Sequence, residues 1–354
     1  MKKTVLGLLV LATGVFIGCQ DNASDLPNNQ QSKIDMSDFY VHTDEFESKS
    51  DKNGDKVCYS MKVLNEQLSK DKNLYKKMYD IEYATRKFIA AKKPSGTGGG
   101  KPGNGGGDDG GGDPVGDNLG VINIPVYVHV VYSNSNENIS DAQVASQIAV
   151  LNDDFRRNNN DANNTPSEFD SVAADTEINF TLANTFRYAN SRTSWGTNNA
   201  VKAEYPPVTP ETHMNIWVAN IGGGILGYAQ FPGGNLATDG IVVSPQYFGT
   251  TGYVAAPFDG GRTTTHEVGH YLNLRHIWGD GRCNRDDFVA DTPSSDRPNY
   301  GCPTSAVHCR SNDQFMNYMD YTDDSCMNMF SLGQKERMRA LFASGGGRAA
   351  LVGN

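Results

Sequence analysis

The sequence predicts a mixed α/β (α+β) fold, in which a helix lies beneath a twisted mixed sheet and an irregular C-terminal subdomain follows. Residues 122–132 (INIPVYVHVVY) are β-branched and alternating, as in a strand. A helix is expected at 263–274, where two histidines four residues apart would share one face. The stretch from there to about residue 330 is rich in Gly, Pro and Asp. It holds four of the six cysteines, which can crosslink a segment with little regular structure.

Further helices and strands are expected on both sides of these segments. Ser140 can cap a helix that runs to about Arg157, because its hydroxyl can accept a hydrogen bond from the first turn. Apolar residues recur at roughly helical spacing over 60–92, which predicts a helix there. The remaining expected elements are strands at 177–186, 213–219, 225–231 and 240–244 and a last helix at 333–342.

Charge and glycine content divide the chain into parts. Residues 20–93 carry 13 basic and 13 acidic side chains, whereas residues 102–354 carry 15 and 28. The acidic part has no basic stripe, which argues against a nucleic acid partner. Glycine-rich residues 94–116 predict a flexible tether that proteases can cut. The expected domains are a signal peptide (1–19), a propeptide with a helical segment (20–93), this linker (94–116) and a compact domain (117–354).

The first 19 residues have the features of a bacterial export signal. Lys2 and Lys3 precede an apolar stretch, residues 5–17, that is too short for a membrane span. The residues before Cys19 resemble a lipobox, so Cys19 would carry a lipid that anchors the protein to a membrane. The expected location is a bacterial outer-membrane, periplasmic or surface face, with extracellular release after processing as a further step. An ordinary signal peptide that contains a cysteine is the alternative.

The segment from Thr265 to His276 fits a catalytic zinc site. His266 and His270 lie four residues apart, so on a helix both can reach one metal ion. Glu267, beside the first histidine, can hold a water on the metal without binding the metal itself. His276 can join them only if the helix stops and the chain turns back. Asn273 tolerates the left-handed backbone that this turn needs.

Three histidines would leave one coordination position open, which is typical of catalytic rather than structural zinc. Zinc lowers the pKa of its bound water to around 7, so Glu267 could complete the deprotonation near neutral pH. Met319 follows downstream and would fit beneath such a metal. A methionine that only fills the core is the alternative for this residue.

The zinc motif followed by Met319 resembles the metzincin peptidases, and the run from His266 to Met329 resembles their pappalysin family. The resemblance covers roughly residues 120–345. Asn273 is a departure, because the family more commonly has Gly there. The shared motifs are His276-Ile-Trp-Gly-Asp, Cys283 followed by Asp286-Asp287, Asp291-Thr292-Pro293, Asn317 to Tyr321, Cys326-Met327-Asn328 and the segment 225–229.

The resemblance implies a metzincin-type zincin that hydrolyses peptide bonds in polypeptide substrates. Glu267 would be the general base, and Tyr321 would donate a hydrogen bond to the oxyanion in the transition state. Met319 would form the floor beneath the metal. The strand at 225–230 would pair with an extended substrate. The Zn2+ ligands would be His266, His270 and His276.

The resemblance also implies two disulfides, Cys283–Cys309 and Cys302–Cys326, although four cysteines by themselves allow three pairings. A second, structural zinc on the four thiolates is the alternative, which their spacing disfavours. Pappalysins carry Ca2+ nearby, and the candidate ligands here are Asp287 and Thr292. The alternative is a solvated acidic loop.

Cys58 lies just before the predicted helix at 60–92 and upstream of the tether. A thiolate is a good fourth zinc ligand, so Cys58 could occupy the water position and keep the precursor latent until the linker region is cut. Similar latency is known in the resembled family. An unpaired surface thiol and an intermolecular disulfide are the alternatives.

Two other functions stay open. A non-catalytic surface lipoprotein could keep the fold for adhesion or binding, but such proteins usually lose a ligand or the base. The metal could also hydrolyse something other than a peptide. For peptides, the resembled enzymes favour a basic residue just after the cut, and Asp323 or Asp324 could line such a pocket.

Overall fold

The computed structural model describes residues 34–43, 58–92 and 117–353. The expected signal peptide with Cys19, and the whole of the expected linker at 94–116, lie outside these residues. Within the described part, no helix has the length and apolarity needed to cross a membrane.

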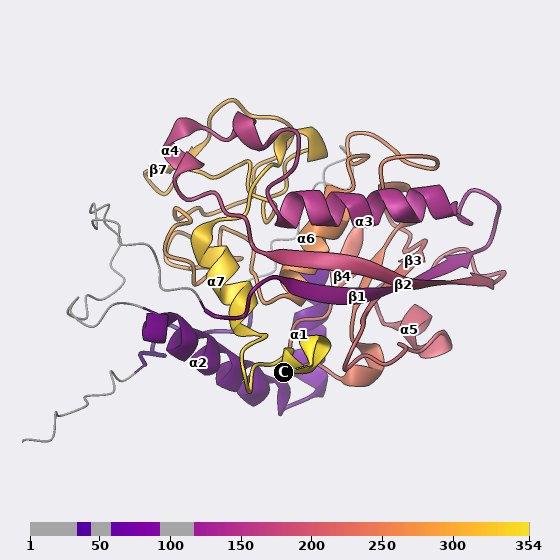
Figure 1. The fold of residues 1–354 in the computed structure, drawn as a ribbon, viewed down its shortest axis with the longest axis horizontal. Helices are drawn as coiled ribbons and strands as arrows, with labels where there is room; N and C mark the ends of the chain where they lie inside the picture. Colours follow the sequence, from indigo (N-terminus) through magenta and orange to yellow (C-terminus); the bar gives the residue numbers. More distant parts are fainter. Residues whose placement is uncertain (1–33, 44–57, 93–116, 354) are drawn as a thin grey trace, which may run out of the picture. The chain divides into compact units, whose positions relative to one another are not determined.

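In the described part of the chain, five strands form one mixed sheet, in agreement with the prediction (Figure 1). Their order is β2-β1-β3-β5-β4. The neighbouring strands are parallel except for β4, which is antiparallel to β5 and lies at one edge. The edge strand β4 is shorter than the strand expected at 225–231. The strands are β1 (Ile122–Tyr132), β2 (Ile178–Ala189), β3 (Met214–Ala219), β4 (Gly227–Ala229) and β5 (Ile241–Val243).

The two faces of the sheet pack into different clusters, because successive residues of a strand point to opposite sides. Val128 of β1 and Ile216 of β3 belong to the main core. This core also includes residues of α3 (Asp141–Phe155) and α6 (Arg262–Tyr271), and α3 crosses one face of the sheet in Figure 1. Trp217 of β3 belongs to a second cluster on the other face. The packing therefore fixes α6 against one side of the sheet.

The segment 60–92 is helical, as predicted, but it forms two helices, α1 (Ser60–Lys70) and α2 (Leu74–Lys92), and not one. The backbone of Asp71 is extended, and its carboxylate accepts a hydrogen bond from the amide of Asn73 at 2.8 Å. Asp side chains compete with the helix for backbone donors, so this polar stretch forms a turn. An apolar cluster that includes Leu64, Leu68 and Met78 packs the two helices together.

The C-terminal part is irregular, as expected, and is crosslinked by the disulfides Cys283–Cys309 and Cys302–Cys326. These are the pairs that the family resemblance implied. With sequence separations of 26 and 24 between the partners, each bridge contributes about 3 kcal/mol by restricting the unfolded chain. The sequence did not predict a short hairpin in this part, β6 (Val307–His308) and β7 (Ser311–Asn312). The other helices are α4 (Ser167–Asp170), α5 (Ala200–Glu204) and α7 (Leu332–Ala340).

Candidate metal centre and active site

Helix α6 carries His266 and His270, and both are fully buried. The helix ends at Tyr271, and Asn273 then adopts the left-handed backbone with φ 72°. Asn tolerates this conformation better than most residues. The chain consequently turns back and brings His276 to the other two histidines.

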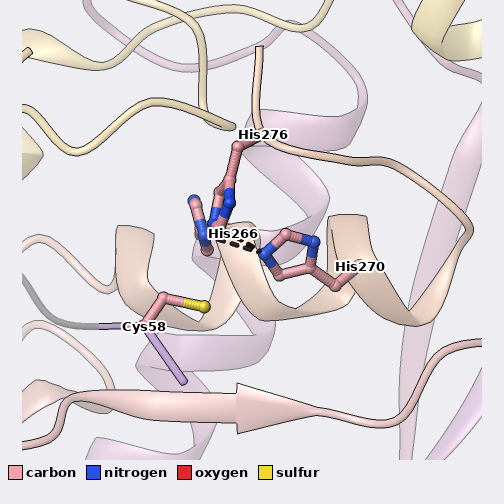
Figure 2. Close-up of side chains that lie close together, drawn as sticks. All are labelled: Cys58, His266, His270 and His276. Atoms are coloured by element: carbon pink, nitrogen blue, oxygen red, sulfur yellow. Dashed lines mark hydrogen bonds between the residues drawn. The ribbon is translucent and has the colours of Figure 1, made fainter. Parts of the chain in front are cut away.

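The three imidazole rings direct their Nε2 atoms toward one another (Figure 2). The Nε2 of His270 lies 3.1 Å from the Nε2 of His266 and 3.1 Å from that of His276. The Nδ1 of His266 donates to the carbonyl of Tyr318 at 2.7 Å, and the Nδ1 of His270 donates to that of Leu274 at 2.9 Å. Because a carbonyl only accepts, these Nδ1 atoms hold the protons, and the neutral rings present Nε2 lone pairs. Lone pairs this close repel unless a cation lies between them, so the donor set fits zinc.

The sulfur of Cys58 is a fourth candidate ligand atom and lies beside the three rings (Figure 2). This sulfur and the histidine nitrogens all lie within 4.8 Å of one another. A β-bridge between Cys58 and Gly227 of β4 holds it there, and the amide of Tyr59 donates to the Gly227 carbonyl at 3.1 Å. Burial, and then the carboxylate of Glu267, raise the pKa of the Cys58 thiol. A bound divalent cation reverses this balance, because a thiol that coordinates a metal is deprotonated.

Two contacts orient the ring of His276. Its Nδ1 pairs with the carboxylate of Asp280. The indole of Trp278 stacks on the ring, with 4.3 Å between the centroids. A carboxylate on the nitrogen that faces away from a metal fixes the tautomer and makes the binding nitrogen more basic. Asp280 is therefore expected to strengthen zinc binding through His276.

We expect Asp280→Asn to weaken zinc binding by about 10- to 100-fold, because an amide cannot supply this negative charge. Competition of the full-length chain with a chelator of known affinity measures the effect. Asp259→Asn is the matched control, since Asp259 is exposed. A folded Asp280→Asn protein with unchanged zinc affinity would contradict the assigned role.

Met319 lies directly against α6. A Cβ added to Gly269 would lie 2.3 Å from the sulfur of Met319, so a larger residue at that helix position would force the Met319 side chain to move. The side chain of Asn317 accepts a hydrogen bond from the Met319 amide at 2.9 Å. The helix and the loop that carries Met319 are thus in close contact, and a role of Met319 as the floor beneath the metal stays a prediction.

Tyr321 lies over the same site. Its ring centroid is 4.9 Å from that of His276, and its hydroxyl donates to the carbonyl of Cys58 at 3.3 Å. The phenol therefore already contacts a peptide carbonyl beside the candidate metal ligands. Its role as an oxyanion donor stays a prediction.

Glu267 contacts Ser60, a residue that no sequence pattern singled out. The Ser60 hydroxyl donates to Oε2 of Glu267 at 2.7 Å and accepts from the amide of Ala229 at 2.7 Å. Both Ser60 and Glu267 are buried. A Cβ added to Gly227 would lie 2.9 Å from the Glu267 side chain, so the edge strand passes closely over this carboxylate. The only available clue was that Ser60 follows Cys58 by two residues.

The structure brings the two candidate calcium ligands together. The Thr292 hydroxyl lies 2.8 and 2.9 Å from the two carboxylate oxygens of Asp287. Asp287 is buried, and burial followed by the charge of Asp286 raises its pKa. Calcium binding by this pair stays a prediction.

Asp324, a candidate for a substrate pocket, also contacts the start of α6. Its carboxylate accepts from the amides of Gly260 and Arg262, each at 3.0 Å. It is buried. These bonds stabilise the beginning of the helix, and a contact with substrate stays a prediction.

Comparison with known proteins places this geometry in a family. The sequence profile described as pregnancy-associated plasma protein-A matches residues 196–343. Extracellular metalloprotease 1 of Coccidioides posadasii is 33% identical over 235 residues, which cover 62% of this chain and 77% of that protein. An extracellular metalloprotease of Arthroderma benhamiae is 33% identical over 234 residues, which cover 62% of this chain and 72% of that protein.

Two solved structures from Tannerella forsythia are similar to this chain. Mature mirolysin in complex with a cleaved peptide is 46% identical, with a TM-score of 0.64, and the match covers 66% of this chain and 96% of that one. A promirolysin mutant is 39% identical, with a TM-score of 0.70, and the match covers 84% of this chain and 97% of that one. Residues 117–354 make up about two thirds of the chain. The promirolysin match therefore extends into the residues before 117.

Proposed function

Because the chain belongs to the pappalysin family of zinc metallopeptidases, we propose that it is an exported endopeptidase made as a latent, lipid-anchored precursor. Relatives named extracellular metalloproteases support export. The similarity to promirolysin, which extends into the N-terminal segment, supports a precursor. The lipid anchor at Cys19 rests on the signal sequence alone.

The proposed mechanism uses the buried residues around α6. His266, His270 and His276 would hold zinc, which when bound acts as a Lewis acid toward water and the scissile carbonyl. The Glu267 carboxylate would take a proton from the attacking water and pass it to the leaving amine. The Tyr321 phenol would donate to the carbonyl oxygen as its negative charge develops.

Polypeptides are the proposed substrates. Mature mirolysin has been solved with a cleaved peptide, which supports this substrate class by similarity. In this chain β4 is an edge strand, and the Gly227 carbonyl and the Ala229 amide both bind residues of the N-terminal segment. An extended substrate could use the same main-chain atoms once that segment leaves.

The observation that carries the proposal is the convergence of Cys58 with the three histidines, whose ligand atoms lie within 4.8 Å of one another. A thiolate at this place would exclude the water that the reaction needs. Cys58 belongs to a segment that precedes the glycine-rich linker. Cleavage in residues 94–116 would allow the segment to leave.

The test uses the full-length chain with equimolar zinc, before and after treatment with a protease that cuts within 94–116. We expect the treated protein to degrade casein and an unstructured peptide library, and a chelator to abolish this activity. Cut sites in the library would show whether basic residues are preferred after the cut. No cleavage by a folded, zinc-loaded and processed protein would favour a binding lipoprotein instead.

Replacing Cys58 tests the latency separately. We expect uncut Cys58→Ala protein to show peptidase activity that the uncut wild type lacks. In the cobalt-substituted wild type, a thiolate ligand gives a charge-transfer band in the near ultraviolet, and this band should be absent in Cys58→Ala. If both proteins have the same cobalt spectrum, Cys58 is not a ligand.

A further inference from the structure

We propose that Asp154, on α3 and outside the zinc motif, is a positioning residue for the metal ligand His266; this inference rests on the function proposed above. The Asp154 carboxylate lies between α6 and the loop that carries Met319. One oxygen accepts from the hydroxyl of Thr265 at 2.7 Å, and the other accepts from the phenol of Tyr318 at 2.9 Å. Asp154 is buried, with 2% of its surface exposed.

Both partners of Asp154 are directly connected to His266, one through the chain and one through a hydrogen bond. Thr265 precedes His266 on α6, and the carbonyl of Tyr318 accepts the hydrogen bond from Nδ1 of His266 at 2.7 Å. One carboxylate therefore holds the backbone that carries the ring and the group that orients the ring. A ligand held from two sides is preorganised for its metal.

The negative charge of Asp154 is needed because the groups around it are all donors. Besides the two hydroxyls, the guanidinium of Arg262, the first residue of α6, lies 3.2 Å from Asp154. An asparagine would present its own amide hydrogens to at least one of these donors. A buried donor without an acceptor costs about 1–3 kcal/mol, which the helix or the loop can relieve only by moving.

The test compares Asp154→Asn with Asp153→Asn in the full-length chain. Asp153 is the adjacent residue on α3 and is exposed, so it is a matched control. We expect Asp154→Asn to weaken zinc binding about 10- to 100-fold and to change the visible absorption spectrum of the cobalt-substituted protein. Asp153→Asn should change neither.

A merely structural role would lower the melting temperature and leave the metal site unchanged. Wild-type zinc affinity and cobalt spectrum in folded Asp154→Asn would therefore overturn the inference. If Asp154→Asn does not fold, Tyr318→Phe can replace it, because that variant removes only the phenolic hydroxyl that links Asp154 to the loop. Wild-type zinc affinity and cobalt spectrum in Tyr318→Phe would also overturn the inference. A wild-type chain that binds no zinc would instead overturn the proposed function.

A second inference comes from a different contact: we infer that Ser60 contributes to latency independently of Cys58, by occupying the proposed general base. This inference also rests on the proposed function. The Ser60 hydroxyl binds Oε2 of Glu267 and the Ala229 amide, each at 2.7 Å. Ser60 begins α1, whose buried residues Met61 and Leu64 pack in an apolar cluster. This packing holds Ser60 in place whether or not Cys58 binds a metal.

Cys58 and Ser60 would block different groups that the proposed reaction needs. The Cys58 sulfur lies beside the histidines, and the Ser60 hydroxyl lies on the carboxylate that would accept the proton of the water. Tyr59, between them, is fixed by its hydrogen bond to Gly227. Removing the thiol alone would leave the base occupied, so Cys58→Ala should be only partly active without cleavage.

The experiment adds Ser60→Ala to the Cys58→Ala chain, with Ser69→Ala as the matched control on the exposed side of α1. A lost hydrogen bond to a charged group corresponds to about a tenfold or larger change, so we expect at least that gain in uncut activity from Ser60→Ala and none from Ser69→Ala. Equal activity of Cys58→Ala with and without Ser60→Ala would overturn the inference.

Hydrogen exchange of the α1 amides gives a readout that needs no catalysis. In the otherwise unchanged chain, Ser60→Ala should speed this exchange about tenfold. When Glu267 is already alanine, the acceleration caused by Ser60→Ala should be smaller by a factor of at least about three. The same acceleration in both backgrounds would mean that Ser60 and Glu267 are not coupled. A failure of the proposed function would appear in the activity assay and leave this comparison intact.

Discussion

Glu267→Gln is expected to lower the peptidase activity of the processed enzyme by about 10²- to 10⁴-fold, which is the usual contribution of a general base. Gln keeps the size of Glu267 and, in the uncut precursor, can still accept from Ser60, but it cannot take a proton from water. The expected loss is in kcat, with little change in KM, because the carboxylate would act on the water and not on substrate binding. Steady-state kinetics on a peptide substrate, after identical processing of both proteins, measure it.

The control for this substitution is Glu211→Gln, which makes the same chemical change at an exposed position. Both variants should bind zinc as the wild type does, since the proposed ligands are the three histidines. A Glu267→Gln enzyme within tenfold of wild-type kcat would mean that another group accepts the proton. Loss of zinc together with activity would mean that Glu267 supports the metal site instead.

The three candidate zinc ligands could be predicted from the sequence because their signal is local. His266 and His270 are four residues apart on one helix, and Asn273, with its left-handed backbone, follows the end of that helix and precedes the third histidine by three residues. The spacing alone therefore determines that the three rings can meet. The strand at 122–132 was equally clear, because its alternation matches the two faces that the structure buries.

Contacts between distant segments could not be identified in this way. Ser60 and Glu267 are separated by 207 positions, and Asp154 and Thr265 by 111. Neither Ser60 nor Asp154 stands out in its own helix, since serine at a helix start and aspartate near a helix end are ordinary residues. Only the packing of α1 and α3 around α6 gives them a partner.

The turn between α1 and α2 was missed for a different reason. Residues 71–73 contain no glycine or proline, and apolar residues keep helical spacing on both sides of them. The turn depends on the Asp71 carboxylate, which captures the amide of Asn73. The pairing of the cysteines likewise required the family resemblance, because spacing alone leaves three arrangements.

Helix α2 is held on the catalytic part by a buried ion pair. The Glu82 carboxylate accepts from both terminal nitrogens of Arg337 on α7, at 3.1 and 2.8 Å, and from Arg86 at 2.8 Å. Glu82 and Arg337 are each 3% exposed. Burial would raise the pKa of Glu82, but the two guanidiniums outweigh it and lower the pKa to about 2. Arg337 lowers the pKa more than Arg86 does, so the charged carboxylate stabilises the docked position of α2.

Glu82→Gln is therefore expected to increase the opening of α2 by about 10²-fold, because it leaves the charge of Arg337 buried without a counter-charge. Hydrogen exchange of α2 amides in the full-length chain measures this opening. Acid should also increase the opening of α2. The pKa of Glu82 is lower in the folded than in the unfolded chain, so its stabilisation of docked α2 is complete above about pH 4.5 and is lost as the pH falls toward 2. The matched control is Glu66→Gln, which removes a surface pair with Lys70 at 3.9 Å and should change little. If the α2 amides exchange at the same rate in Glu82→Gln and Glu66→Gln, the ion pair does not hold the N-terminal segment, and the apolar cluster around Leu64 and Met78 must do so instead.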